Sequence, residues 1–272
     1  MSCFEISEGD TGSLVDKVTI ITGDRSAITE ASSGIGQATV QLFLSRGATV
    51  HGADLQPLKT SIDSPKFTLT TLDVTIWPDL CALFHQVNTK HRRIGILFAN
   101  AGIYSPENFL SLRQGTDGKL EEPLKFTLQV NLVALANQMA LAAHYMTTQQ
   151  TPRGGSIILA ASSTSYQRFD APDYVALKHG LIGLVRGASV HAQNNNLPLR
   201  INAVAPSWTR THRVPLAQAP FEDLGIISHT PEAVACSVAL LATDEIRRCQ
   251  RIHSRAGEHV EVEGPMHAAM LK

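Results

Sequence analysis

The stretch "ITGDRSAITEASSGIG", residues 21–36, lies between a β-branched run and an amphipathic segment. Without the seven residues Asp24–Glu30 it reads "ITGASSGIG", a glycine-rich turn that joins a strand to a helix. Gly34 and Gly36 would let the backbone approach a pyrophosphate, and a helix N-terminus favours that negative charge. The stretch therefore predicts a dinucleotide-binding turn near the start of an α/β domain.

Apolar runs and helical patterns alternate along the rest of the chain. The runs are continuously apolar, which is typical of parallel strands covered on both faces. This alternation predicts one α/β domain over 1–272, with a Rossmann-type doubly wound parallel sheet of about seven strands and helices on both faces. The aperiodic stretch at about 207–230 is typical of a substrate lid. The expected strands are 17–22, 48–53, 66–72, 94–99, 155–161 and 199–205, and the expected helices are 35–47, 78–91, 123–146 and 172–192.

The composition narrows the class of partner. With 43% hydrophobic residues and a formal charge of −1, the chain has material for a core and no basic surplus that favours nucleic acid or an anionic membrane. Its four cysteines form no CxxC pair and no metal-ligand spacing with histidine, so we expect reduced thiols and no metal. The start has no apolar signal region, and no apolar run approaches the ~20 residues that span a bilayer. A cytoplasmic protein without a membrane partner is expected.

Asp54 ends the second expected strand, about twenty residues after the glycines. A carboxylate at that place accepts hydrogen bonds from the adenosine ribose of a dinucleotide. Because it also repels a 2′-phosphate, Asp54 followed by the apolar Leu55 favours NAD over NADP.

Further motifs extend the pattern, and from about Asp16 to about Gly264 the chain resembles the short-chain dehydrogenase/reductase family. The family's TGxxxGxG turn is matched once 24–30 is set aside, its adenine-contacting Asp–Val by "LDV" at 72–74, and its NNAG segment by "ANAG" at 99–102. The resemblance implies a small-molecule substrate and a nicotinamide cofactor. The cofactor contacts that it implies are Thr22, Gly23, Ser32, Ser33, Gly34, Ile35, Gly36, Asp54, Leu55, Asp73, Val74, Asn100, Ala101, Gly102, Tyr174, Lys178, Pro206, Thr209 and Thr211.

A catalytic constellation belongs to the same resemblance. In "YVALK", Tyr174 and Lys178 stand four residues apart and share one helix face. Ser162 ends a strand twelve residues upstream, and Asn131 lies on the preceding helix. These residues match the family's Asn–Ser–Tyr–Lys tetrad, with Ser163 as an alternative to Ser162. The substrate contacts are assigned to Ser162, Ser163, Thr164 and Trp208.

Each member of this tetrad has a chemical role. The hydroxyl proton of a secondary alcohol must leave as the cofactor takes the hydride. A free tyrosine has a pKa near ~10, so we expect the Lys178 ammonium and the charge of an oxidised nicotinamide to lower the pKa of Tyr174. Ser162 would stabilise charge on the reacting oxygen. The resemblance implies that Asn131 holds a water that links Lys178 to solvent.

The chain departs from the family pattern at three places. Residues 24–30 could extend into solvent at little entropic cost, fold Arg25 over the cofactor onto a 2′-phosphate, or block the phosphate site. Ser207 replaces a glycine in "NAVAPSWTRT"; it introduces strain if the position needs a positive φ and is otherwise a tolerated serine. Only Gly264 remains of the two glycines that usually follow the last strand.

These features favour an NAD(H)-dependent oxidoreductase that interconverts a secondary alcohol and a ketone on a bulky, fairly apolar molecule. The alternatives are an NADPH-dependent ketoreductase of the same family, or a Rossmann-fold binding module or non-redox catalyst whose cofactor loop is disrupted by 24–30. The segments 123–148 and 172–193 are apolar around much of their circumference, and in relatives they pair between subunits, so a homodimer or homotetramer is expected. The apolar residues of the lid are Trp208, Val214, Pro215, Leu216, Pro220, Phe221 and Leu224.

Overall fold

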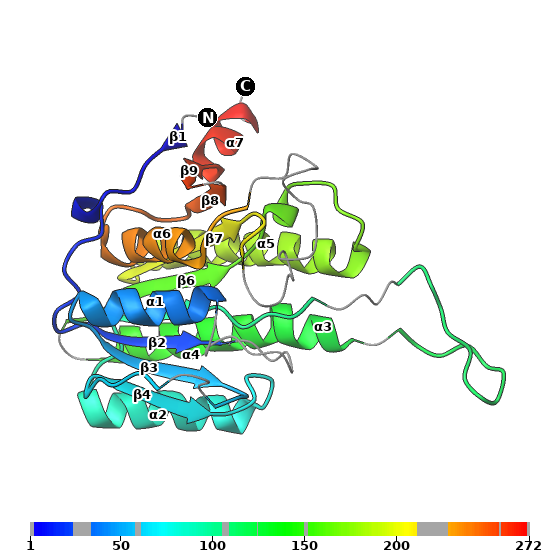
Figure 1. Ribbon diagram of the computed structural model, residues 1–272, viewed down its shortest axis with the longest axis horizontal. Helices are drawn as coiled ribbons and strands as arrows, with labels where there is room; N and C mark the ends of the chain where they lie inside the picture. Colours follow the sequence, from blue (N-terminus) through cyan, green and yellow to red (C-terminus); the bar gives the residue numbers. More distant parts are fainter. Residues whose placement is uncertain are drawn as a thin grey trace.

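A parallel β-sheet lies at the centre of the computed structural model, which describes residues 3–23, 34–57, 61–104, 109–123, 125–149, 152–210, 228–255 and 257–270. Seven strands run parallel in the order β4-β3-β2-β5-β6-β7-β8, with helices on both faces (Figure 1). This arrangement confirms the predicted fold class. The parallel strands are β2 (Val18–Thr22), β3 (Thr49–Asp54), β4 (Phe67–Thr71), β5 (Ile96–Ala99), β6 (Gly155–Ala160), β7 (Leu199–Pro206) and β8 (Arg251–Arg255).

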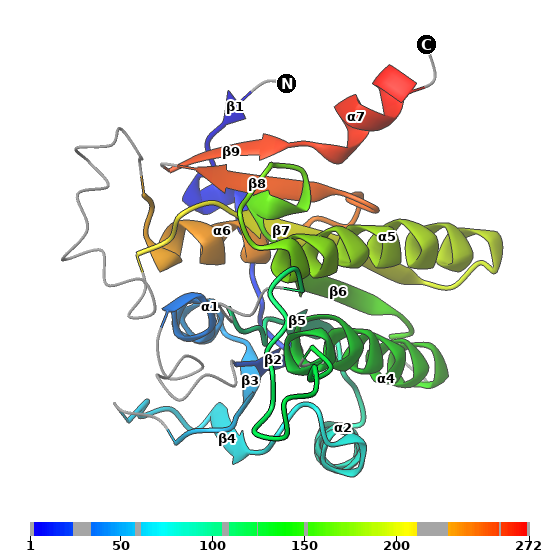
Figure 2. The same cartoon turned by 90° about the vertical axis from the view of Figure 1, so that its right-hand side faces the viewer.

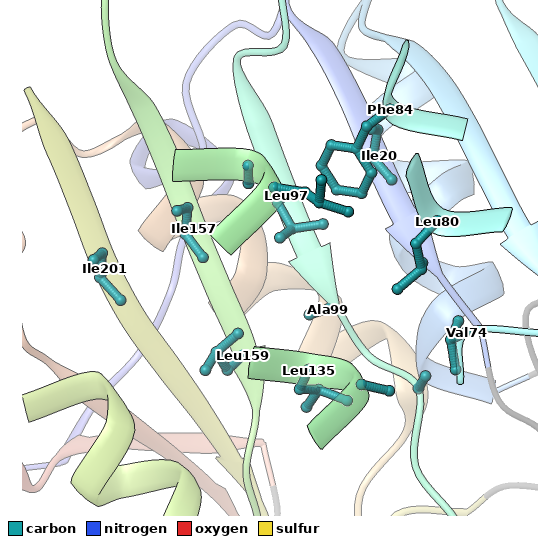
Figure 3. Close-up of a cluster of buried hydrophobic side chains, with 14 of the residues drawn as sticks. Ile20, Val74, Leu80, Phe84, Leu97, Ala99, Leu135, Ile157, Leu159 and Ile201 are labelled. Carbon is teal, nitrogen blue, oxygen red and sulfur yellow. The ribbon is translucent and has the colours of Figure 1, made fainter. Parts of the chain in front are cut away.

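Successive side chains of each strand enter two different cores, which explains why the strands are continuously apolar. Ile20 packs into the core on one face of the sheet, and its neighbour Ile21 packs into the core on the other. Figure 3 shows the first core, where Leu80, Phe84 and Leu135 from helices meet Ile20, Leu97 and Ile157 from strands. The helices on this face are α2 (Trp77–His91), α4 (Ala134–Thr148) and α5 (Pro172–Asn194), and those on the other are α1 (Gly34–Ser45) and α6 (Pro231–Thr243) (Figure 2).

The helices begin where the sequence supplies start signals. A proline lies in the first turn of α2, α5 and α6, where no backbone donor is lost. At α6 the Thr230 hydroxyl also accepts from the amide of Ala233. Helix α2 ends at His91, and the next residue, Arg92, caps it with a left-handed φ of 59°.

The order of the strands reverses between β2 and β5. From β2 the chain builds outward through β3 and β4, then returns to the other side of β2 to form β5 and continues through β6, β7 and β8. The carboxyl ends of β2 and β5 therefore form the topological switch point, where open α/β sheets bind ligands. The glycine-rich turn follows β2, and the "ANAG" segment covers the end of β5.

The sheet has nine strands among the described residues, whereas about seven were expected, and β8 lies where the sequence pattern indicated no strand. The two additions are antiparallel: β9 (Glu258–Glu261) pairs with β8, and β1 (Cys3–Phe4) pairs with β9. Strands of two and four residues are too short to form a recognisable apolar run, so the sequence pattern does not show them. After β9, the Glu261 carboxylate accepts from the amides of Glu263 and Gly264 at the start of α7 (Glu263–Met270). Two 3-10 turns complete the elements, η1 (Glu8–Asp10) and η3 (Ser163–Ser165).

One long helical stretch runs from α3 (Phe126–Leu128) through the π-helical turn η2 (Gln129–Val133) into α4. Contrary to the sequence expectation, this stretch is long and apolar enough to cross a membrane by length and composition. A core helix passes the same test, and α4 packs against β5, β6 and α2. The π turn matters more, because such turns are frequent at functional sites and this one contains Asn131.

Candidate active site

The phosphate turn is described on both sides of the insertion. The Gly23 amide donates to the Ala53 carbonyl at 2.6 Å, which fixes the end of β2 beside β3. Gly34 starts α1 with a φ of 66°, a conformation that favours glycine. Ile35 packs at the edge of the second core, and Gly36 is buried. The insertion 24–30, Ser32 and Ser33 lie outside the described residues.

Thr22 belongs to the scaffold below the predicted cofactor site. Its fully buried hydroxyl donates to Gln138 Oε1 at 2.8 Å and accepts from the amides of Asn100 (3.2 Å) and Ala101 (3.4 Å). The hydroxyl thereby ties β2 to the "ANAG" segment and to α4. The cofactor contact assigned to Thr22 stays a prediction, and the structure shows that its hydroxyl is hydrogen-bonded within the protein.

Two acidic residues lie at the carboxyl ends of β3 and β4. Asp54 is buried and accepts from the Gln56 amide at 2.9 Å, with Leu55 half-buried beside it. Asp73 accepts from both the amide and the hydroxyl of Thr75. The side chain of Val74 belongs to the hydrophobic core (Figure 3), so only its backbone can face a ligand.

Gly102, Asn131 and Lys178 converge above the end of β5. A Cβ placed on Gly102 would stand 3.0 Å from Asn131 Oδ1 and 3.6 Å from Lys178 Nζ, so the three positions are in direct proximity. The Asn131 amide group forms two hydrogen bonds with the backbone of Ile103, accepting from its N–H at 2.6 Å and donating to its carbonyl at 2.7 Å. Asn131 thus locks the turn that carries Gly102.

Tyr174, Ser162 and Lys178 meet at the same edge of the sheet. Tyr174 and Ser162 share a hydrogen bond between their side chains, which identifies Ser162 as the serine beside the phenol. The Ser162 hydroxyl also accepts from the Thr164 amide at 3.2 Å, and this contact caps η3, which contains Ser163. Lys178 Nζ lies 5.5 Å from the centre of the Tyr174 ring and donates to the Ala160 carbonyl at 2.8 Å.

The electrostatics of this pair differ from the sequence expectation. Burial raises the pKa of Tyr174 to about 12; the hydrogen bond with Ser162 lowers the pKa, and Tyr104 raises it further. Burial lowers the pKa of Lys178 to about 8. Desolvation penalises the charged form of both groups, so Lys178 by itself does not make Tyr174 acidic. The expected lowering of the Tyr174 pKa also requires the charge of an oxidised nicotinamide, and it stays a prediction for the complex with that coenzyme.

The loop after β7 connects Pro206 and Thr209 to the base of the lid. The Thr209 hydroxyl donates to the Ser207 carbonyl at 3.1 Å and lies 2.9 Å from His229 Nε2, and the two segments pair through a β-bridge between Thr209 and His229. Ser207 has no positive φ, so the strain considered from sequence does not arise. Thr211 and the lid residues 211–227 lie outside the described residues.

Sequence reasoning missed three residues at this site. His229 closes the lid base, and Tyr104 and Phe169 form aromatic contacts with Tyr174 and Trp208 respectively. Tyr104 follows "ANAG" by two residues, and that position at the switch point is the signal that could have identified it. For Phe169 and His229 the sequence offers no comparable signal, because their partners are distant along the chain.

The fold and this site define a Rossmann-type protein with a Ser–Tyr–Lys centre at its switch point. A model of the short chain dehydrogenase family matches residues 24–219. The chain is 40% identical over 264 residues (97% of this chain, 86% of the relative) to the "Short-chain dehydrogenase/reductase ascJ" of Acremonium egyptiacum. It is 30% identical over 201 residues, 70% of each chain, to "15-hydroxyprostaglandin dehydrogenase [NAD(+)]" of Homo sapiens.

Among solved structures, the ligand-free aldohexose dehydrogenase of Thermoplasma acidophilum superposes with a TM-score of 0.73 at 25% identity, over 90% of this chain and 94% of that chain. The chain belongs to the short-chain dehydrogenase/reductase family. It is accordingly an oxidoreductase of a family that uses NAD(P) and acts on small molecules.

Proposed function

We propose that the protein is an NAD(H)-dependent oxidoreductase that interconverts a secondary alcohol and a ketone on a bulky, largely apolar small molecule. The observation that carries the proposal is the meeting of Ser162, Tyr174 and Lys178 at the carboxyl edge of the central strands. Gly102 and Asn131 lie beside Lys178, which supports the proposal. The NAD(+)-dependent relative supports the choice of cofactor.

The residues present fit a nicotinamide dinucleotide. A Cβ on Gly102 would fill the space beside Lys178 that the glycine leaves. Gly34 has a positive φ at the start of α1, which lets the backbone approach a phosphate. Asp54 would hold the adenosine ribose, and Lys178 would hold the nicotinamide ribose. When bound, NAD⁺ supplies the hydride acceptor for alcohol oxidation.

The protein's own residues handle the proton. With a pKa of about 12, Tyr174 is protonated at neutral pH and is ready to donate to a ketone oxygen. In the direction of oxidation it must receive the hydroxyl proton as phenolate, a form that positive charge beside the ring favours. Ser162 donates to the reacting oxygen and stabilises the charge that develops there. Lys178, with a pKa of about 8, can exchange a proton near neutral pH.

The test of this function combines coenzyme binding with turnover. A coenzyme at 100 times its Kd raises the free energy of unfolding by ~2.7 kcal/mol, which a thermal-shift measurement detects. NAD-dependent oxidation of secondary alcohols supports the proposal. Binding without turnover on a broad panel favours a non-redox catalyst, and the absence of binding by either coenzyme indicates a blocked phosphate site.

Asp54 is expected to give NADH a lower Kd than NADPH by at least about tenfold, because its carboxylate repels a 2′-phosphate. Fluorescence titration of both coenzymes measures the two Kd values. Asp54→Ser should narrow the ratio mainly by tightening NADPH, and Asp79→Ser, at an acidic residue in the first turn of α2, is the control. A wild-type preference for NADPH contradicts this assignment.

We also propose that the protein forms a homo-oligomer through α4 and α5. Val190 on α5 and Val133 in the π turn before α4 expose apolar side chains that a second copy could cover. Light scattering coupled to size exclusion should give a mass of two or four chains. Val190→Lys should lower that mass, whereas Ile246→Lys, also at an exposed apolar residue, should not. A monomeric wild type contradicts this proposal.

A further inference from the structure

Aromatic rings run in a series from the catalytic tyrosine to the base of the lid. The ring centre of Tyr104 lies 5.6 Å from that of Tyr174 and 6.5 Å from that of Phe169, at interplanar angles of 76° and 68°. The Phe169 ring lies 6.1 Å from Trp208, at 61°. All three contacts have the edge-to-face geometry that aromatic pairs prefer. We call Tyr104, Phe169 and Trp208 the aromatic row.

The row is assembled from three separate loops. Tyr104 follows β5, Phe169 lies between η3 and α5, and Trp208 follows β7. All three loops lie beyond the carboxyl ends of their strands or directly before the helix that carries Tyr174. Residues distant in sequence therefore present their rings at one place, beside the reacting centre.

The rings of the row remain accessible. Tyr104 is 55% exposed, Phe169 is 38% exposed and Trp208 is 36% exposed. Large aromatic side chains contribute most to stability when they are buried, so three adjacent accessible rings are poorly explained by packing alone. A contiguous accessible apolar surface is instead typical of a ligand-binding surface.

We propose that the aromatic row recognises the substrate and selects a planar π ring attached directly to the carbinol or carbonyl carbon. This inference rests on the proposed function. The face of an aromatic ring is partly negative and its edge partly positive, so a planar ring continues the edge-to-face series, whereas a saturated ring gains only dispersion contacts. Because Tyr104 contacts Tyr174 directly, a ring that packs on Tyr104 would lie beside the phenol, with its attached carbon near the phenol hydroxyl.

Charged residues of both signs flank the row in the sequence, whereas the row itself carries no charge. Arg168 and Asp170 flank Phe169 in the sequence, and both are exposed. Arg210, two residues after Trp208, is exposed as well. The row therefore distinguishes ligands by ring character.

The experiment compares 1-phenylethanol with 1-cyclohexylethanol, which have the same carbon skeleton and differ in the planarity of the ring. The two alcohols differ in intrinsic reactivity, so the measured quantity is the ratio of their kcat/KM values and its change in a variant. Phe169→Leu should lower the ratio of phenyl to cyclohexyl turnover by about 2- to 10-fold. Phe4→Leu makes the same substitution in β1, outside the row, and should leave the ratio unchanged.

A fall of the ratio in Phe169→Leu, but not in Phe4→Leu, supports the proposal, and an unchanged ratio overturns it. Turnover of 2-butanol, which has no ring, and the thermal midpoint show whether the variant is folded. If Phe169→Leu is not folded, Trp208→Leu is used in its place, and the same fall in the ratio of phenyl to cyclohexyl turnover is expected.

A failure of the proposed function can be told apart from a failure of the aromatic row. If no alcohol is oxidised with either coenzyme, the row is tested by binding: Trp77→Phe leaves Trp208 as the only tryptophan, and its fluorescence reports added ketone. Tighter binding of acetophenone than of cyclohexyl methyl ketone supports the row, and equal binding overturns it.

Discussion

Replacing Tyr174 by phenylalanine is expected to lower kcat/KM for a confirmed alcohol by about 10²- to 10⁴-fold, because the reaction loses its proton donor and acceptor. The hydroxyl shares a hydrogen bond with Ser162, and the ring stays in place through its contact with Tyr104. Coenzyme affinity should change little, since the variant removes no charge. Steady-state kinetics and coenzyme titration on the same preparation measure both quantities.

The matched control for this variant is Tyr166→Phe. Tyr166 is also a largely buried tyrosine whose pKa is raised by burial to about 12, but its ring packs on Arg251 and His253. Its hydroxyl has no hydrogen-bond partner among the described residues, so its removal should leave turnover near the wild-type value. Full turnover by Tyr174→Phe would refute the proposed mechanism.

The raised pKa of Tyr174 predicts how the rates of alcohol oxidation and ketone reduction change with pH. Alcohol oxidation needs the deprotonated phenol, so its kcat/KM should rise with pH through the neutral range. Ketone reduction needs the protonated phenol and should not fall until the pH approaches the tyrosine pKa of the enzyme–coenzyme complex. The two directions measured on one enzyme separate proton handling from a general effect of pH on folding.

Acidification from pH 7 to about 5 is expected to destabilise the fold by several kcal/mol. Burial lowers the pKa of His51, His229 and His259 to about 4 each, and all three are nearly inaccessible to solvent. In the unfolded chain their pKa is near ~6.5, so between these values the unfolded state binds protons that the folded state excludes. The contribution of these histidines to the free energy of unfolding is therefore fully present above about pH 6.5 and is lost as the pH falls toward 4. Each histidine contributes roughly 1.4 kcal/mol for every unit by which its folded pKa lies below its unfolded pKa.

The neighbours of these histidines explain why protonation is costly. His51 Nε2 lies 2.8 Å from His91 Nε2, and Lys90 adds positive charge beside the pair. His229 contacts Thr209 and is within electrostatic reach of His253, His259 and Arg210. Acid should thus loosen the lid base together with the core.

Urea unfolding at a series of pH values measures this effect. The free energy of unfolding should fall by roughly 2 kcal/mol per buried histidine between pH 7 and 5. His51→Gln should flatten the dependence by that amount, while His85→Gln, at an exposed position on α2, should not. A wild-type stability that does not change over this range contradicts the prediction.

The sequence by itself determined most elements of the central sheet and the helix face that Tyr174 and Lys178 share. Continuous apolar runs predicted six of the seven parallel strands with end points within two residues, because a strand buried on both faces is apolar at every position. The pattern did not predict β8 or α6. The spacing of Tyr174 and Lys178 predicted that they share a helix face, and the π turn with Asn131 lies within a helix that the pattern predicted. These are local properties, encoded over a few turns of chain.

The tertiary structure alone decided which distant groups meet and how burial alters them. Thr22 lies 116 residues from Gln138, and no local pattern shows that its hydroxyl is used inside the protein. The antiparallel strands β1 and β9, the bridge at His229 and the aromatic row depend likewise on contacts between remote loops. Burial raises the pKa of Tyr174, and this effect depends on everything packed around the phenol and not only on the lysine one turn away.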